Sequence, residues 1–166
     1  DVKEEFGNKI KYILDGGTCS VGIESTIINL TGRPSILRLG GLDILKIQKT
    51  LGFKIKTSIN PNKKIAPGQS RLHYSPGIPL RMDITKPKNG EAFIMIKRKK
   101  TKLKNYFYLT SKNNLDEAAK NLYSCLRKIK NEGYKSIAVE KIPNIGLGKA
   151  INDRLKRASE FKIIKN

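Results

Sequence analysis

The sequence is poor in the residues that build disulfide scaffolds and metal clusters. Its 166 residues include two cysteines, one histidine and no tryptophan. Cys19 and Cys125 are too few and too far apart for either kind of site, so we expect reduced thiols in a cytoplasmic protein. His73 has no second histidine with which to share a metal ion. We therefore expect no metal held by protein side chains.

Long apolar runs are absent as well. The apolar stretch Ile27–Leu30 is interrupted by Asn29, and no run in the sequence approaches the roughly 18 apolar residues that a membrane-spanning helix needs. Asp1–Glu5 is charged and no apolar stretch follows it, so we expect no signal peptide and no contact with a membrane. The length suits one ordinary domain or two small ones with a real core.

Acidic residues are scarce. Only 14 Asp and Glu stand against 34 Lys and Arg, which gives a net charge of +20. Such a surface attracts polyanions such as tRNA and nucleotides, although a codon bias toward lysine explains the charge equally well. The densest run, Lys97–Lys104, is either a solvated loop or a tRNA contact. The aromatic residues that follow it, Tyr106–Tyr108, predict a strand.

Short strands and one helix are predicted near the start of the chain. Asp15–Gly17 and residues 31–34 carry turn signals, and the second turn predicts a β-hairpin. Asp43 is placed to begin a short amphipathic helix. The expected strands span 11–14, 24–30 and 35–38, and the expected helix spans 42–51.

Prolines interrupt the middle of the chain. Residues 52–80 contain four of them, at positions 61, 67, 76 and 79, and show no regular period. We interpret this stretch as an extended linker, and a structureless segment of this length within a compact protein tends to be functional.

Strands and helices alternate after residue 80. Asn114 is a candidate cap for the longer helix, and Gly133 follows its end. The order predicts an α/β layer structure with a mostly parallel sheet. The expected strands span 80–84, 92–97, 106–110 and 136–139, and the expected helices span 114–130 and 147–158.

Three loops carry side chains suited to binding oxyanions. Ser25 and Thr26 follow a glycine-rich loop at the mouth of a strand, where hydroxyl groups donate to phosphate or carboxylate oxygens. Arg38 precedes paired glycines, a position suited to bidentate phosphate binding. His73 and Tyr74 lie in the proline-rich linker, where they would stack on a nucleotide or hydrogen-bond to it. The alternatives are an ordinary turn, a surface arginine and a structural histidine.

Taken together, four stretches in this order resemble the threonylcarbamoyl-AMP synthase (L-threonylcarbamoyladenylate synthase) family, whose members are related to YrdC. They are Leu14-Asp-Gly-Gly with Val21-Gly-Ile-Glu-Ser-Thr-Ile-Ile, Ile36-Leu-Arg-Leu-Gly-Gly, Ala66-Pro-Gly with His73-Tyr-Ser-Pro, and Gly146-Leu-Gly-Lys-Ala-Ile-Asn-Asp-Arg-Leu-Lys-Arg-Ala. Each stretch alone is weak, but the ordered set is specific and covers nearly the whole chain.

The resemblance implies a reaction and a set of site residues. The family condenses L-threonine, bicarbonate and ATP into threonylcarbamoyl-AMP and pyrophosphate for threonylcarbamoyladenosine modification of tRNA, with Mg²⁺ carried by the phosphates. By resemblance, Ser25 and Thr26 line the threonine and nucleotide pocket, and Arg38 contacts phosphate. His73 and Tyr74 are similar to the linker pair that folds over the nucleotide. The chemistry needs no protein nucleophile, because the substrate carboxylate attacks the α-phosphate.

Two departures from the family pattern limit what this chain would do alone. Leu39 stands where the family usually has proline, and no match to the family's Lys-x-Arg motif precedes Asp15. The implied architecture is the end of a YrdC-like α/β nucleotide-binding domain at 1–51, a linker at 52–80 that folds over the nucleotide site, and a small Rossmann-like α/β domain at 81–166.

Two hypotheses follow for the chain as a whole. The first is an incomplete synthase, from a split, decayed or truncated gene. Its first 50 residues would expose sheet edges and apolar surface unless a separate chain supplies the missing amino-terminal half. The second is a non-catalytic, basic RNA-binding or partner module.

Overall fold

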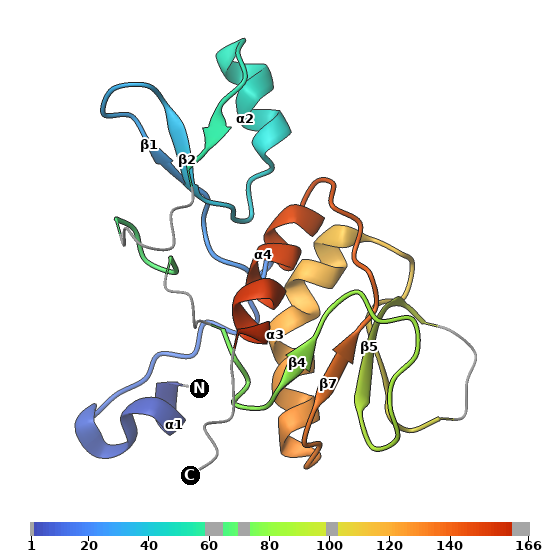
Figure 1. Cartoon of the computed structure of the whole chain (residues 1–166). Helices are drawn as coiled ribbons and strands as arrows, with labels where there is room; N and C mark the ends of the chain where they lie inside the picture. The colour runs from blue at the N-terminus through green and yellow to red at the C-terminus, as the bar shows by residue number, and fades with distance from the viewer. Residues whose placement is uncertain (1, 59–64, 70–73, 99–102, 161–166) are drawn as a thin grey trace.

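A four-stranded parallel sheet dominates the carboxy-terminal part of the molecule (Figure 1). The computed structural model describes residues 2–58, 65–69, 74–98 and 103–160. The sheet has the order β4-β7-β5-β6. Helix α3 packs against β6 and α4, and α4 packs against β4. The elements are β4 Leu80–Arg81, β5 Ala92–Lys97, β6 Tyr106–Thr110, α3 Leu115–Asn131, β7 Ile137–Val139 and α4 Gly148–Ser159.

Burial explains why these segments form the larger unit. Five of the six residues of β5 are buried, as expected for a strand in the middle of a parallel sheet. Alternate β5 side chains point to opposite faces, so Ile94 joins the core beneath the helices while Phe93 joins a second cluster with Tyr106. Asn114 caps α3 by accepting hydrogen bonds from the backbone N–H groups of Asp116 and Glu117.

A smaller sheet and a short helix stand to one side of this unit (Figure 1). Strand β2 pairs antiparallel with β1 and parallel with β3, and Asp43 caps α2 by accepting from the N–H of Leu45. The core here is a cluster of only four buried isoleucines, at positions 36, 44, 47 and 55. The elements are α1 Val2–Phe6, the 3-10 turn η1 Gly7–Lys9, β1 Ile27–Asn29, β2 Ser35–Arg38, α2 Ile44–Leu51 and β3 Lys56–Thr57.

The predicted mixed α/β class with a parallel sheet is confirmed, and the two main helices lie within one residue of their expected bounds. The strand predicted at 11–14 is wrong, because this segment pairs with no strand among the described residues and lies open to solvent. The strands expected at 24–30 and 80–84 are shorter than predicted, spanning Ile27–Asn29 and Leu80–Arg81. The predicted linker contains the short strand β3.

No helix in the described part of the chain is long and apolar enough to cross a membrane.

Candidate functional site

Arg38 and Ser25, predicted from separate loops, lie together at the end of the small sheet. The Nε of Arg38 donates to the backbone oxygen of Ser25 at 3.0 Å, and one terminal nitrogen donates to the Ser25 hydroxyl at 3.2 Å. The other terminal nitrogen donates to the backbone oxygen of Pro67 at 3.3 Å. One guanidinium group therefore joins the loop before β1, the end of β2 and the described part of the linker.

Thr26 has a different neighbour. Its hydroxyl donates to the backbone oxygen of Leu42 at 2.7 Å and accepts from the Leu42 N–H at 3.3 Å. Gly40 lies so close that an added Cβ would come 2.2 Å from the backbone carbon of Ser25. The Thr26 hydroxyl thus connects the segment before β1 to the residues that precede α2. Its hydrogen bonds are those of a residue that stabilises the local backbone.

Tyr74 brings the end of the linker to the same region. Its ring stacks on Tyr123 of α3 with centroids 5.7 Å apart, and the guanidinium of Arg154 in α4 lies 4.9 Å from its centroid. A Cβ added to Gly68 would come 2.4 Å from the Tyr74 hydroxyl and 3.3 Å from Cδ of Arg38. The Tyr74 hydroxyl therefore lies near the aliphatic part of the Arg38 side chain. His73, the other predicted linker residue, falls outside the described residues.

A buried cluster of charges lies beneath Tyr74. The side chain of Arg154 is only 1% exposed and donates to a Glu24 carboxylate oxygen at 3.0 Å and to the backbone oxygen of Leu39 at 2.7 Å. It also contacts Asp153 at 2.6 Å, which pairs with Arg157 at 3.2 Å. These two arginines and two carboxylates sum to zero charge, so the burial of Arg154 is electrostatically compensated.

The Glu24 carboxylate is held in its charged form. Burial alone would raise the pKa of Glu24, but a backbone hydrogen bond and the charge of Arg154 outweigh it, and the pKa lies below its ordinary value. Tyr123 donates its hydroxyl to the two Glu24 oxygens at 3.3 and 3.4 Å. Burial raises the pKa of both Tyr74 and Tyr123, so both hydroxyls stay protonated at neutral pH.

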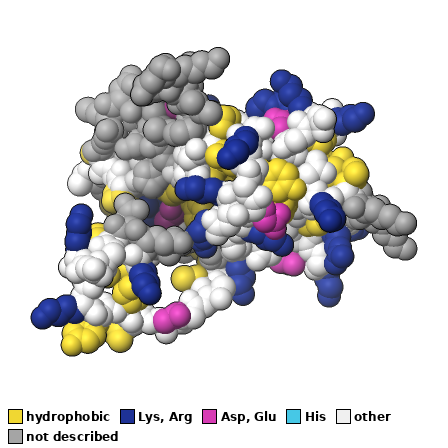
Figure 2. Space-filling view, turned by 90° about the horizontal axis from the view of Figure 1, so that it is seen from below, with side chains coloured by type: hydrophobic (Ala, Val, Ile, Leu, Met, Phe, Trp, Pro, Cys, Tyr) yellow, Lys and Arg dark blue, Asp and Glu magenta, His cyan; other side chains and the backbone are white. Residues whose placement is uncertain are grey.

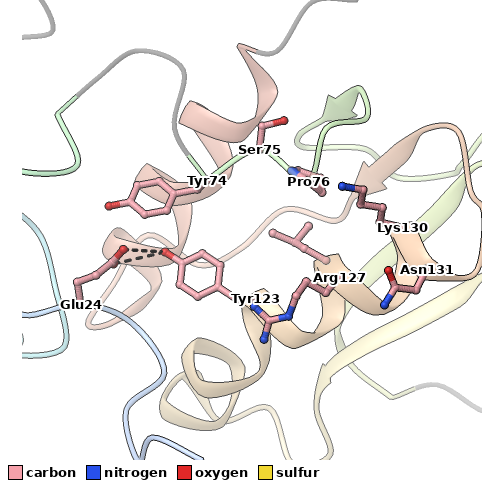
Figure 3. Close-up of a pocket in the computed structure, with 9 residues that line it drawn as sticks. Glu24, Tyr74, Ser75, Pro76, Tyr123, Arg127, Lys130 and Asn131 are labelled. Atoms are coloured by element: carbon pink, nitrogen blue, oxygen red, sulfur yellow. Dashed lines mark hydrogen bonds between the residues drawn. The ribbon is translucent and has the colours of Figure 1, made fainter. Parts of the chain in front are cut away.

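A pocket of about 580 Å³ opens between α3 and the end of the linker (Figure 3). Glu24, Tyr74 and Tyr123 lie at one end, and Arg127, Lys130 and Asn131 lie at the other. Ser75, Pro76 and Leu126 complete the lining. The described wall offers hydrogen-bond donors, an ionised carboxylate and aromatic rings, which suit binding and orientation better than nucleophilic attack.

Among the described residues, no group of three His, Cys, Asp or Glu side chains is placed to hold a metal ion.

The sequence interpretation assigned no role to Glu24, Tyr123 or Arg154. Arg154 had a detectable signal, because it lies four residues from both Ala150 and Ala158 on the apolar stripe of its helix. A charged residue on such a stripe is expected to have a buried partner. For Glu24 and Tyr123 no local signal exists, since they lie 99 positions apart in the sequence.

Comparison with known proteins assigns the chain to a family. Residues 42–160 match the family described as "Threonylcarbamoyl-AMP synthase, C-terminal domain", and residues 1–40 match the family described as "Telomere recombination". The threonylcarbamoyl-AMP synthase of Pyrococcus abyssi is 33% identical over 99% of this chain and 54% of its own length. The Bacillus subtilis enzyme of the same name is 26% identical over 99% of this chain and 53% of its own length.

Solved structures agree with the sequence matches. The crystal structure of P. abyssi Sua5 complexed with L-threonine superposes with a TM-score of 0.77 at 31% identity, over 95% of this chain and 52% of that one. A P. abyssi Sua5 variant, with a histidine and the following tyrosine replaced by alanine, gives a TM-score of 0.70 at 30% identity, over 99% of this chain and 51% of that one. The chain spans about half the length of these relatives, and it belongs to the threonylcarbamoyl-AMP synthase family.

Proposed function

We propose that this chain forms the carboxy-terminal half of a threonylcarbamoyl-AMP synthase. The observation that carries the proposal is the convergence of Ser25, Arg38 and Tyr74 from three separate segments, in a chain whose family is shown. The remaining half of the relatives' length, whether joined to this chain or supplied as a separate one, would complete a substrate site around Ser25 and Arg38, which do not line the 580 Å³ pocket described above. The substrates are L-threonine, bicarbonate and ATP, and a relative of similar fold was crystallised with L-threonine.

The proposed chemistry fits side chains that bind rather than react. The carbamate oxygen of N-carboxythreonine attacks the α-phosphorus of ATP; the new O–P bond forms while the bond from the α-phosphorus to pyrophosphate breaks. Arg38 would contact the phosphates, because a guanidinium carries five N–H donors and a charge that is never lost. Ser25, hydrogen-bonded to Arg38, would help to hold the substrate oxygens. Mg²⁺ enters with the triphosphate as part of the substrate.

Titration with Mg·ATP in the presence of L-threonine tests this assignment. Arg38→Ala should weaken ATP binding by about tenfold or more, because a charge-assisted phosphate contact is lost. Arg33→Ala is the matched control, since Arg33 is an exposed arginine in the neighbouring turn. Equal ATP affinities in the Arg38→Ala and Arg33→Ala variants would show that Arg38 does not bind the nucleotide.

A second assay addresses whether the chain is sufficient. Threonine-dependent ATP–pyrophosphate exchange by this chain alone should be very weak, because the described strands supply only part of a pocket. Robust turnover would contradict the proposal that the chain is an incomplete synthase.

The alternative function is a non-catalytic RNA-binding module, favoured by the net charge of +20. Lys97, Arg98 and Lys104 are exposed, whereas 99–102 lie outside the described residues. Figure 2 shows lysines and arginines spread over one face of the molecule with acidic side chains among them. A salt titration of tRNA binding separates the functions: steep salt dependence without ATP affinity favours the module.

A further inference from the structure

We propose that Arg154 is a positioning residue through which the carboxy-terminal unit holds the candidate threonine and nucleotide site in shape. The inference rests on the proposed function, because it assigns Arg154 a task within that site. Arg154 itself would touch no substrate; it acts through the three segments that carry Ser25, Arg38 and Tyr74.

The contacts of this one guanidinium reach all three segments. It pairs with Glu24 at 3.0 Å, immediately before Ser25, and donates to the backbone oxygen of Leu39 at 2.7 Å, immediately after Arg38. Its face lies 4.9 Å from the centroid of the Tyr74 ring. Movement of Arg154 would therefore disturb the loop before β1, the end of β2 and the linker together.

Lysine could not make this set of contacts. A guanidinium is planar, so its edge can donate to several acceptors while its face stacks on an aromatic ring, whereas an ammonium is a compact point charge. Arg154 is 1% exposed and has Asp153 as a second carboxylate partner, which compensates for its loss of hydration. The contacts at position 154 therefore require the planar shape of the arginine guanidinium as well as its charge.

The backbone of Tyr74 gives independent support. Its φ angle is +64°, in the left-handed region that non-glycine residues seldom adopt and that surrounding contacts must maintain. Those contacts are the Tyr123 ring on α3 and Arg154 on α4, and Figure 3 shows the Tyr74 and Tyr123 rings side by side. The carboxy-terminal unit thus supplies the groups that fix the end of the linker next to Gly68 and Arg38.

Hydrogen exchange on the full chain tests the proposal without any ligand. Arg154→Met should accelerate amide exchange about tenfold in 24–26, 38–41 and 74–78, because these segments lose their shared partner. Exchange in β5 and the middle of α3 should stay as in the parent protein. Lys156→Met, an exposed charge on the same helix, is the control and should change neither set.

Two further variants separate positioning from general support. Arg154→Lys keeps the charge but should fail to restore slow exchange, whereas Tyr123→Leu should loosen 74–78 while leaving 38–41 protected. ATP affinity should fall about tenfold with Arg154→Met and remain low with Arg154→Lys. These variants also provide the test if Arg154→Met does not fold.

Three results would overturn the inference. They are unchanged exchange in all three segments, equal loss of protection throughout α3 and β5, and full recovery with lysine. If the parent chain binds no ATP, the proposed function fails, while the exchange measurements still decide whether Arg154 orders these segments.

Discussion

The two parts of the molecule bury their apolar side chains to very different extents. In the carboxy-terminal unit, the main cluster draws buried residues from β4, β5, β6, β7, α3 and α4. The amino-terminal part has a buried cluster of four isoleucines and leaves Tyr12 88% and Leu14 98% exposed. Yet Ser25 and Arg38, the candidate binding residues, lie in this weakly packed part. The candidate binding residues thus lie in the part of the fold that has the smaller core of its own and depends most on contacts with the carboxy-terminal unit.

A cavity in the larger core should have the greatest effect on stability. Leu122→Ala removes a side chain that is 0% exposed beneath the sheet. We expect a loss of about 2–5 kcal/mol in the free energy of unfolding. Urea denaturation followed by far-ultraviolet circular dichroism measures it, with Leu103→Ala, at a 56% exposed position, as the control. A loss below about 1 kcal/mol would contradict the contrast between the two cores.

A close backbone contact in the amino-terminal part comes second. Gly40→Ala would bring a Cβ within 2.3 Å of the Thr26 nitrogen, so β2 and the loop before β1 must move apart. We expect a cost of about 1–3 kcal/mol and faster exchange at 24–26 and 40–42. Gly16→Ala, which meets no atom within 4 Å, is the control. An equally small loss of stability in the Gly40→Ala and Gly16→Ala variants would show that the backbone at Gly40 is not tightly packed against 24–26.

Acid should weaken the carboxy-terminal unit through Glu91, with a smaller effect. Arg81 donates to the two Glu91 oxygens at 3.0 and 2.7 Å, and these hydrogen bonds hold the pKa of Glu91 below its ordinary value. A lowered folded-state pKa stabilises the protein above the unfolded-state pKa, and this contribution disappears as the pH falls through the folded-state pKa. Urea denaturation between pH 6 and 3, about the acid range of carboxylates, should show a shallower decline for Glu91→Gln than for the parent. Identical slopes would refute this role.

Replacing an exposed apolar residue should change stability least. Leu14→Lys should alter the free energy of unfolding by less than about 0.5 kcal/mol, because the side chain makes few contacts to lose. It should nevertheless reduce concentration-dependent association, since exposed apolar side chains favour self-contact. Sedimentation velocity at several concentrations measures this, with Lys11→Leu expected to increase association. Unchanged association in both variants would show that this surface is inert.

The sequence was most informative where structure is local. Asn114 identifies the start of α3 because its side chain caps the helix directly, and Asp43 does the same for α2. The segment 11–14 has strand-forming residues, but a strand also needs a partner, which propensity alone cannot supply.

The site was predicted in part for the same reason. Ser25 and Arg38 were named from their loop contexts, and the structure brings them into contact. The position of Arg154 on an apolar helix stripe indicated a buried partner, but its carboxylate partner, Glu24, lies 130 positions away and could not be identified from the sequence. Whether Ser25, Thr26, Arg38, His73 and Tyr74 bind substrate stays a prediction, as do the domain boundaries at 51 and 80.

The two cysteines differ in exposure, so their alkylation rates report on different parts of the molecule. Cys19 is exposed in the amino-terminal part, whereas Cys125 lies on the buried face of α3, where burial raises the pKa of its thiol to about 12. Because thiolates are the species that alkylate, a maleimide should modify Cys19 quickly and Cys125 only when α3 leaves the sheet. A time course of mass spectra gives both rates, and the rate at Cys125 relative to that at Cys19 would report how often α3 opens in the unmutated chain.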